Sequence, residues 1–166
     1  MSTIKIVYGS GGGNTELVCE KVAEVLEQKK HKVKLLKAKL TEPKDVGSFD
    51  LLILASPTYG HGLYERFFAG FMAKAESELD VAGKKCATIG LGDMIYDPDY
   101  HVESGKMIQQ FLKRKGALMP IIPLFVTKSP VPHLEGRIQS WAESVDKILS
   151  DQLQPVNAGA SCGDAE

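Results

Sequence analysis

The sequence predicts an α/β fold: a doubly wound, five-stranded parallel sheet with helices on both faces. Short apolar segments alternate along the chain with longer segments whose apolar residues recur every three or four positions. Strands that alternate with helices form a parallel sheet, because each helix returns the chain across one face of the sheet. The 166 residues are enough for one domain with a sizeable core. Together these three observations favour the doubly wound arrangement.

Five segments are predicted to be strands. The first is rich in β-branched residues, and the second has one polar side and is expected near an edge of the sheet. The third is a continuous apolar run, as expected of a strand that is covered on both faces. The fifth contains Pro120 and Pro123, which favour an outer position or irregular pairing because proline donates no ladder hydrogen bond. The five segments are residues 3–9, 31–40, 49–56, 84–92 and 117–127.

Four segments are predicted to be helices, because their apolar residues recur at helical spacing. The first begins at Thr15, and Gly116 is expected to end the third. The other three segments are residues 62–79, 103–115 and 133–150. The second helix is expected to bury a stripe of Leu63, Phe67, Phe68, Phe71 and Met72. Residues 1–150 are therefore predicted to form one domain, and residues 151–166 a flexible tail with little to bury.

The composition argues against several classes of protein. A formal net charge of −1 gives no overall attraction to nucleic acid or to a membrane surface. We find no apolar run of about 20 residues and no signal-like N-terminus. The three cysteines, Cys19, Cys86 and Cys162, show no metal-binding or disulfide spacing. We therefore expect a cytoplasmic monomer with free thiols and with no nucleic-acid or membrane partner.

The candidate binding residues follow three of the strands, at the edge where doubly wound folds bind ligands. The first loop joins a strand to a helix. A run of glycines there can turn successive backbone N–H groups toward an anion, and the helix dipole favours negative charge. Its candidate phosphate-binding residues are Ser10, Gly11, Gly12, Gly13, Asn14 and Thr15. From these residues alone, a tight turn in which Asn14 or Thr15 caps the helix is also possible.

Two other nucleotide-binding loops match this stretch less well. A P-loop requires Gly-Lys-Ser/Thr, where this chain has Gly13-Asn14-Thr15. A dinucleotide fingerprint requires a third glycine at Asn14 and an acidic residue after the second strand, which ends among lysines. The loop therefore lacks the features that bind triphosphates or dinucleotides.

Two further loops add aromatic residues at the same edge. The second loop follows the third strand and contains Ser56, Pro57, Thr58, Tyr59, Gly60 and His61. An ordinary turn also collects serine, proline and glycine, so this loop alone is not decisive. The third loop follows the fourth strand and contains Leu91, Gly92, Asp93, Tyr96 and Asp97. A phosphate cradle beside two aromatic faces suits a planar ring on a phosphorylated tail, and FMN fits this description.

These loops resemble those of the flavodoxins, particularly the short-chain kind. "IVYGSGGGNTELV" is similar to the family's phosphate loop, and "SPTYGHG" and "GDMIYD" are similar to the loops that cover the two flavin faces. The resemblance extends from the first strand to the last helix, and the fifth strand carries no long insertion. It implies a flavodoxin-like FMN-binding domain that acts as a low-potential one-electron carrier.

The resemblance also implies roles for the candidate residues. Residues 10–15 hold the phosphate, and Tyr59 and Tyr96 enclose the ring. The polar edge of the ring is met by Thr58, Gly60, His61, Leu91, Gly92 and Asp93. The implied partners are donors of the flavodoxin or ferredoxin reductase type and low-potential acceptors, which dock near the flavin edge. Asp93, Asp97 and Asp99 are expected to steer basic partners there.

One departure from the family concerns the phosphate loop. Gly11 and Gly12 stand where the family often has threonine, so two hydroxyl donors are missing. We therefore expect weaker phosphate anchoring, and tighter FMN binding on adding threonine at either position.

Three rival functions share this architecture. An FMN-dependent NAD(P)H:quinone-type reductase usually carries longer loops that build a substrate pocket, and no such insertion occurs here. A signalling receiver requires an aspartate after the third strand, where Ser56 stands. A third possibility is a flavodoxin-like domain that works within a larger assembly, with the polar tail as a tether.

Overall fold

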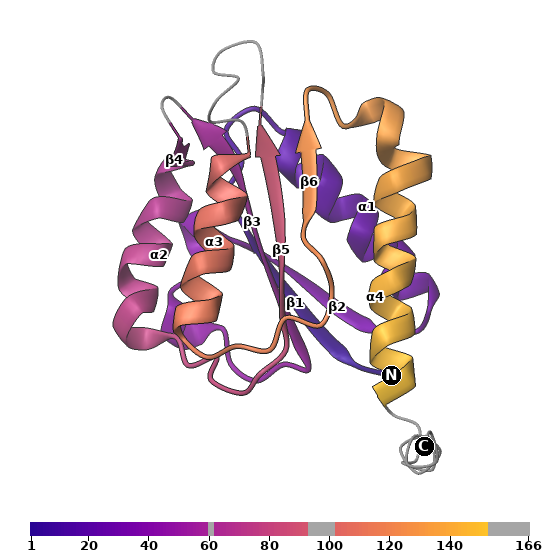
Figure 1. Cartoon of the computed structure of the whole chain (residues 1–166), viewed down its shortest axis with the longest axis horizontal. Helices are drawn as coiled ribbons and strands as arrows, with labels where there is room; N and C mark the ends of the chain where they lie inside the picture. The colour runs from indigo at the N-terminus through magenta and orange to yellow at the C-terminus, as the bar shows by residue number, and fades with distance from the viewer. Residues whose placement is uncertain (60–61, 93–101, 153–166) are drawn as a thin grey trace, which may run out of the picture.

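The computed structural model describes residues 1–59, 62–92 and 102–152. Five parallel strands form one sheet in the order β2-β1-β3-β5-β6, with helices on both faces (Figure 1). The strands are β1 (Thr3–Tyr8), β2 (Lys32–Lys37), β3 (Leu51–Tyr59), β5 (Cys86–Gly92) and β6 (Leu124–Thr127). The predicted doubly wound, five-stranded parallel sheet is confirmed. The structure adds β4 (Leu63–Tyr64), which pairs antiparallel with the end of β3.

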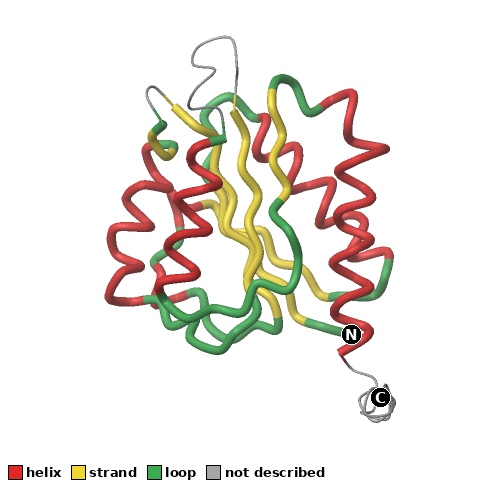
Figure 2. The backbone as a smooth tube through the Cα atoms, in the orientation of Figure 1, coloured by secondary structure: helices red, strands yellow, loops and turns green. Residues whose placement is uncertain are grey.

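The four long helices form the two outer layers. α1 (Asn14–Gln28) and α4 (Gln139–Gln152) lie on one face of the sheet, and α2 (Arg66–Glu78) and α3 (Glu103–Arg114) lie on the other (Figure 2). All five parallel strands point the same way, so their carboxyl ends meet at one edge (Figure 1). We call this the carboxyl edge and the opposite one the amino edge.

Each face of the sheet has its own hydrophobic core. Successive side chains of a strand point to opposite faces, so the apolar run of β3 serves both cores. Ile53 packs with α1 and α4, whereas Leu52 and Leu54 pack with α2 and α3. All three side chains are fully buried, and burial of each stabilises the fold by about 1.5–3 kcal/mol. Such a strand must be central, and it is.

The outer strands are shorter than the sequence predicts. β2 ends at Lys37 and is followed by two short turns, η1 (Ala38–Leu40) and η2 (Pro43–Asp45). Of the segment 117–127, only Leu124–Thr127 joins the sheet as β6, although Leu118 makes one isolated bridge to Lys85. Pro120 and Pro123 interrupt the segment because they cannot donate ladder hydrogen bonds. β6 lies at the edge, so the predicted outer position is confirmed.

The prediction for the second helix was partly wrong. α2 begins at Arg66 and not at residue 62, because the Glu65 carboxylate accepts a hydrogen bond from the Phe68 amide (3.0 Å) and caps the helix there. Phe68, Phe71 and Met72 are buried as predicted, but Leu63 and Phe67 are exposed. Leu63 belongs to β4, and Phe67 lies in the first turn of α2 on its solvent side.

The last helix begins with a 3₁₀ turn, η3 (Val131–His133), which is followed by a π-helical turn, η4 (Leu134–Ile138). It then continues as α4 to Gln152, two residues beyond the predicted end. Gly116, with φ of 82°, follows α3 as predicted. None of the helices in the described ranges is long and apolar enough to cross a membrane.

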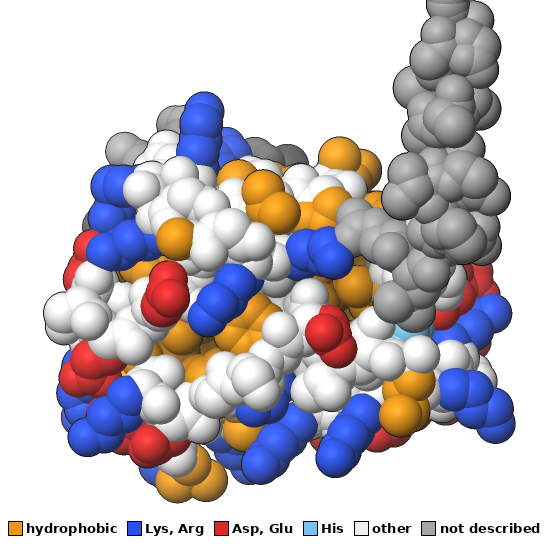
Figure 3. Space-filling view, turned by 90° about the horizontal axis from the view of Figure 1, so that it is seen from below, with side chains coloured by type: hydrophobic (Ala, Val, Ile, Leu, Met, Phe, Trp, Pro, Cys, Tyr) orange, Lys and Arg blue, Asp and Glu red, His pale blue; other side chains and the backbone are white. Residues whose placement is uncertain are grey.

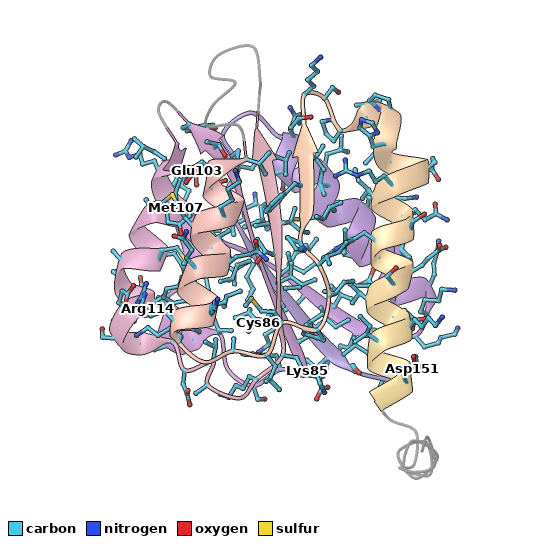
Figure 4. The ribbon with its side chains drawn as sticks, in the orientation of Figure 1. Lys85, Cys86, Glu103, Met107, Arg114 and Asp151 are labelled. Atoms are coloured by element: carbon cyan, nitrogen blue, oxygen red, sulfur yellow. The ribbon has the colours of Figure 1, made fainter. Side chains whose placement is uncertain are left out.

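A groove of about 430 Å³ lies between α2 and α3. Tyr64, Met72 and Met107 contribute to its lining. Arg114, at the end of α3, bridges the two helices through hydrogen bonds of 2.9 and 2.8 Å to the Glu76 carboxylate. Met107 and Arg114 lie on the side of α3 that faces α2 (Figure 4).

At the amino edge, a buried histidine joins the start of the chain to α4. His31 Nδ1 accepts a hydrogen bond from the Ser2 amide (3.1 Å), and its Nε2 lies 2.8 Å from Asp146 Oδ1. Because Nδ1 accepts, Nε2 carries the proton and donates to Asp146. Where this edge is visible in Figure 3, lysine and arginine side chains are scattered among apolar and acidic ones.

Candidate functional site

The first predicted loop lies at the carboxyl edge, between β1 and α1. α1 begins at Asn14, and Gly13 precedes it with φ of 93°, a conformation that side chains rarely allow. The Ser10 hydroxyl accepts hydrogen bonds from the amides of Gly13 (3.0 Å) and Glu16 (3.4 Å). The loop is therefore closed over the N-terminus of α1, where the helix dipole favours an anion.

Thr15 provides an independent indication of a ligand at this helix end. Its side chain is 1% exposed, and its Oγ1 has no hydrogen-bond partner within the described part of the chain. A buried hydroxyl without a partner costs about 1–3 kcal/mol of folding free energy. An acceptor oxygen bound beside the first turn of α1 would satisfy it, as a phosphate oxygen does. Thr15 is therefore the predicted residue whose geometry most directly fits a bound phosphate.

The two central glycines differ in the space around them. A Cβ atom on Gly11 would lie 1.7 Å from the Tyr59 hydroxyl oxygen, whereas one on Gly12 would meet nothing within 4 Å. The ring of Tyr59, which is 40% exposed, thus reaches over the loop at Gly11. We expect threonine at either position to tighten FMN binding, but the structure has open space for the side chain only at Gly12, whereas at Gly11 the Tyr59 side chain would have to move.

The second predicted loop is in part a strand. β3 continues to Tyr59, with Thr58 and Tyr59 paired to β4 and Pro57 opposite Leu91 of β5. The buried Ser56 hydroxyl donates to the Pro57 carbonyl (2.8 Å) and accepts from the Glu65 amide (3.2 Å). These contacts hold Tyr59 on a rigid support. Gly60 and His61 lie outside the described residues.

Two residues that the sequence analysis did not single out, Ser104 and Glu65, position this strand end. Ser104, buried in the first turn of α3, donates through its hydroxyl to the Ser56 carbonyl (3.0 Å). Its amide donates to Thr58 Oγ1 (3.1 Å) and its hydroxyl lies 2.9 Å from that atom. The buried Glu65 carboxylate caps α2 and lies so close to Gly9 that a Cβ there would be 2.2 Å from Oε1. Both are polar residues just before or within the first turn of a helix, and this position was the signal in the sequence that could have identified them.

The third predicted loop is described only where it leaves β5. Leu91 is buried, and the Gly92 carbonyl accepts a hydrogen bond from the Lys128 amide (2.9 Å). Asp93, Tyr96 and Asp97 lie outside the described residues, as does the segment 153–166 of the predicted tail.

A carboxylate lies beside the phosphate loop, in the first turn of α1. Glu16 accepts a hydrogen bond from the Tyr8 hydroxyl (2.9 Å) and lies 3.9 Å from the Lys37 ammonium. Burial, and then the hydrogen bond to Glu16, raise the pKa of the Tyr8 hydroxyl far above its usual value. Tyr8 therefore stays a neutral donor to the Glu16 carboxylate.

The described parts of the three loops come together at one place. The loop 10–15, the end of β3 and the end of β5 all lie at the carboxyl edge, over neighbouring strands (Figure 1). They combine a helix N-terminus, a hydroxyl that has no partner among the described residues and an aromatic ring. This set fits a phosphate monoester that carries a flat ring, and FMN is such a molecule.

The comparisons with known proteins agree with this geometry. The family model for flavodoxins matches residues 6–149. A flavodoxin from Maridesulfovibrio salexigens is 32% identical over 152 residues, which are 89% of this chain and 100% of that protein. A solved short-chain flavodoxin associated with a PDU bacterial microcompartment superposes with a TM-score of 0.79 at 26% identity, covering 89% of this chain and 99% of that one. A flavodoxin from Fusobacterium nucleatum, solved with flavin mononucleotide bound, shares the fold (TM-score 0.68, 20% identity, 89% and 98% covered).

Proposed function

The chain belongs to the flavodoxin family, and from this premise we propose that it carries single electrons at low potential between redox proteins. Its cofactor is FMN, and it transfers electrons instead of converting a substrate. Bound FMN supplies the one-electron redox chemistry. The chain's own residues hold it, orient it and limit its contact with water.

We assign the phosphate to residues 10–15. The observation that carries this assignment is the buried Thr15 hydroxyl, which has no partner among the described residues and lies at the N-terminus of α1. The amides at this helix end and the Ser10 hydroxyl add donors, and the open space at Gly12 leaves room for the phosphate. Asn14, at the first position of α1, completes the set.

We assign the ring to the ends of β3 and β5. Tyr59 covers one face, and Ser56, Pro57 and Thr58 form the wall that Ser104 braces. We further assign to the ring site Leu91 and Gly92 at the end of β5, where Leu91 pairs with Pro57. The remaining proposed contacts, Gly60, His61, Asp93, Tyr96 and Asp97, rest on the sequence. In this arrangement residues 1–150 form the FMN-binding domain, and 151–166 remain the proposed tail.

The family acts with redox partners, and we propose two kinds for this chain. Donors of the flavodoxin or ferredoxin reductase type and low-potential acceptors would dock at the carboxyl edge, where the proposed cofactor site opens. We further propose a cytoplasmic monomer. The buried free thiols of Cys19 and Cys86 support an environment that keeps cysteines reduced.

Cofactor uptake and partner dependence test the proposal. The apoprotein is titrated with FMN, and quenching of FMN fluorescence should give a saturable one-to-one isotherm. The loaded protein is then mixed with NAD(P)H and a quinone, with and without a separate reductase. If the protein is a carrier, NAD(P)H is oxidised only when the separate reductase is present. Turnover without it would favour the quinone-type reductase, and absence of FMN binding would refute both functions.

A further inference from the structure

Exposed apolar side chains gather at the carboxyl edge beside the proposed cofactor site. Leu40 is 77% exposed, Leu63 62% and Phe67 41%. Leu40 lies in η1 directly after β2, Leu63 in β4 and Phe67 in the first turn of α2. Single exposed apolar residues are normal on a protein surface, but three from segments that meet at one edge indicate an interaction site.

Two cations accompany these side chains. The Lys39 ammonium lies 5.1 Å from the centre of the Phe67 ring, and the Arg66 guanidinium lies 5.4 Å from it. Both distances are within the range of cation–π contacts, which hold the exposed ring in place. They also show that η1 and the start of α2 are neighbours, although Arg66 follows Lys39 by 27 positions in the chain. Lys39, Arg66 and Phe67 thus lie together, and the exposed Leu40 and Leu63 belong to segments at the same edge.

The acidic side chains nearest to this surface along the described chain are already engaged. The Glu65 carboxylate is buried and caps α2. Glu42 binds the Lys74 ammonium at 2.9 Å. Among the described residues, the surface therefore combines apolar side chains with two cations. Asp93, Asp97 and Asp99, which we expect to attract basic partners at this edge, lie outside the described residues.

We propose that this cationic–apolar surface, formed by Lys39, Leu40, Leu63, Arg66 and Phe67, docks a redox partner whose contact surface has an apolar centre ringed by carboxylates. The inference rests on the proposed function, since it specifies the chemistry of the partner at the same edge. Protein interfaces combine a buried apolar and aromatic core with a polar border, and arginine and phenylalanine are enriched in them. Opposite charges on the two borders speed the encounter and fix its orientation.

The position of the surface suits electron exchange. Leu63 lies directly opposite Tyr59 in the β3–β4 pair, and the Tyr59 ring reaches over the phosphate loop. A partner seated on Leu63 and Phe67 is therefore beside the proposed cofactor. One electron then passes from one protein to the other; one is oxidised, the other is reduced, and no bond is formed or broken.

A binding experiment tests the chemistry of the partner without relying on electron transfer. The ¹⁵N-labelled, FMN-loaded protein is titrated with a synthetic peptide that has a Leu-Trp pair between two runs of glutamate, and with the same peptide carrying lysine instead of glutamate. The glutamate peptide should shift the amide signals of residues 39–40 and 63–67, and the lysine peptide should not. Equal binding of the two peptides, or shifts confined to other residues, would overturn the proposal.

Charged oxidants test the same surface kinetically. The reduced protein is mixed with anionic hexacyanoferrate(III) or cationic hexaammineruthenium(III), each of which takes up one electron. The Lys39→Gln/Arg66→Gln variant should lose on the order of threefold in rate with the anion at low ionic strength and gain with the cation. The difference should vanish near 1 M salt, where the screening length is about 3 Å.

The control variant is Lys29→Gln/Lys32→Gln, which removes the same charge at the amino edge, at exposed residues. It should change the rates much less than the first variant. Equal effects of the two variants would overturn the docking surface while leaving FMN binding and the carrier function intact. Failure of the wild type to bind FMN would instead overturn the proposed function itself.

Discussion

Replacing Thr15 by valine should stabilise the apoprotein and weaken FMN binding at the same time. Valine has almost the same shape, but it removes the buried hydroxyl that has no partner among the described residues. Since such a group costs about 1–3 kcal/mol, the free energy of unfolding of the apoprotein should rise by about 1 kcal/mol. The loaded protein loses a hydrogen bond to a charged phosphate, which is worth about 1.5–3 kcal/mol. The Kd for FMN should therefore rise about 10- to 100-fold.

Two measurements on the same variant decide the matter. Urea unfolding of the apoprotein gives the change in stability, and quenching of FMN fluorescence gives the Kd. Thr15→Ser keeps the hydroxyl and loses one methyl group, so it should bind FMN nearly as well as the wild type while its apoprotein is less stable. The reasoning is refuted if Thr15→Val destabilises the apoprotein and leaves the Kd unchanged, because the hydroxyl would then serve the fold alone.

Four further substitutions have expected outcomes. Gly12→Thr should tighten FMN binding about fivefold, because it adds one hydrogen-bond donor in open space. Gly11→Thr should weaken FMN binding, because it displaces Tyr59. Equal Kd values of the two variants in the fluorescence titration would contradict this. Ser104→Ala should lower the free energy of unfolding in urea by about 1–3 kcal/mol, since the buried Ser56 carbonyl loses its donor and the Thr58 hydroxyl loses its acceptor, and an unchanged midpoint would count against this role. Burial raises the pKa of the Tyr64 hydroxyl from 10.0 to about 12. The stability that the neutral hydroxyl contributes is therefore complete below pH 10.0 and is lost as the pH rises through about 12. Tyr64→Phe should flatten this alkaline decline of the melting temperature in thermal melts.

Much of the fold follows from local patterns in the sequence. The apolar run of β3 indicates a strand covered on both faces, and the lysines of β2 indicate a strand at the edge. The start of α2 could not be placed in this way, because Leu63 and Phe67 continue the helical spacing across a boundary. That boundary depends on Glu65, whose carboxylate caps the helix. Capping depends on one side-chain contact. It sets the start of the helix at residues where the spacing of the apolar side chains indicates an earlier start.

The candidate site could be located from the sequence but not built from it. Three glycines at the start of a helix indicate a phosphate loop, yet the sequence does not distinguish Gly11 from Gly12. The difference arises because Tyr59, 48 residues further along the chain, lies over only one of them. Ser104 of α3 was missed for a related reason, since its partners Ser56 and Thr58 lie in β3, far away in the chain. Contacts between distant segments have no signature in a local pattern.

The hydrogen bonds of His31 at the amino edge have a practical consequence for attaching the protein to other materials. His31 binds the Ser2 amide and faces Asp146 of α4, so the first residues are secured on the side of the sheet opposite the phosphate loop. Met1 is 83% exposed there. A linker added at Met1 would thus anchor the molecule to an electrode with its redox end facing the solution. Oriented films of this kind permit voltammetry in which exchange with the surface and exchange with soluble partners are measured separately.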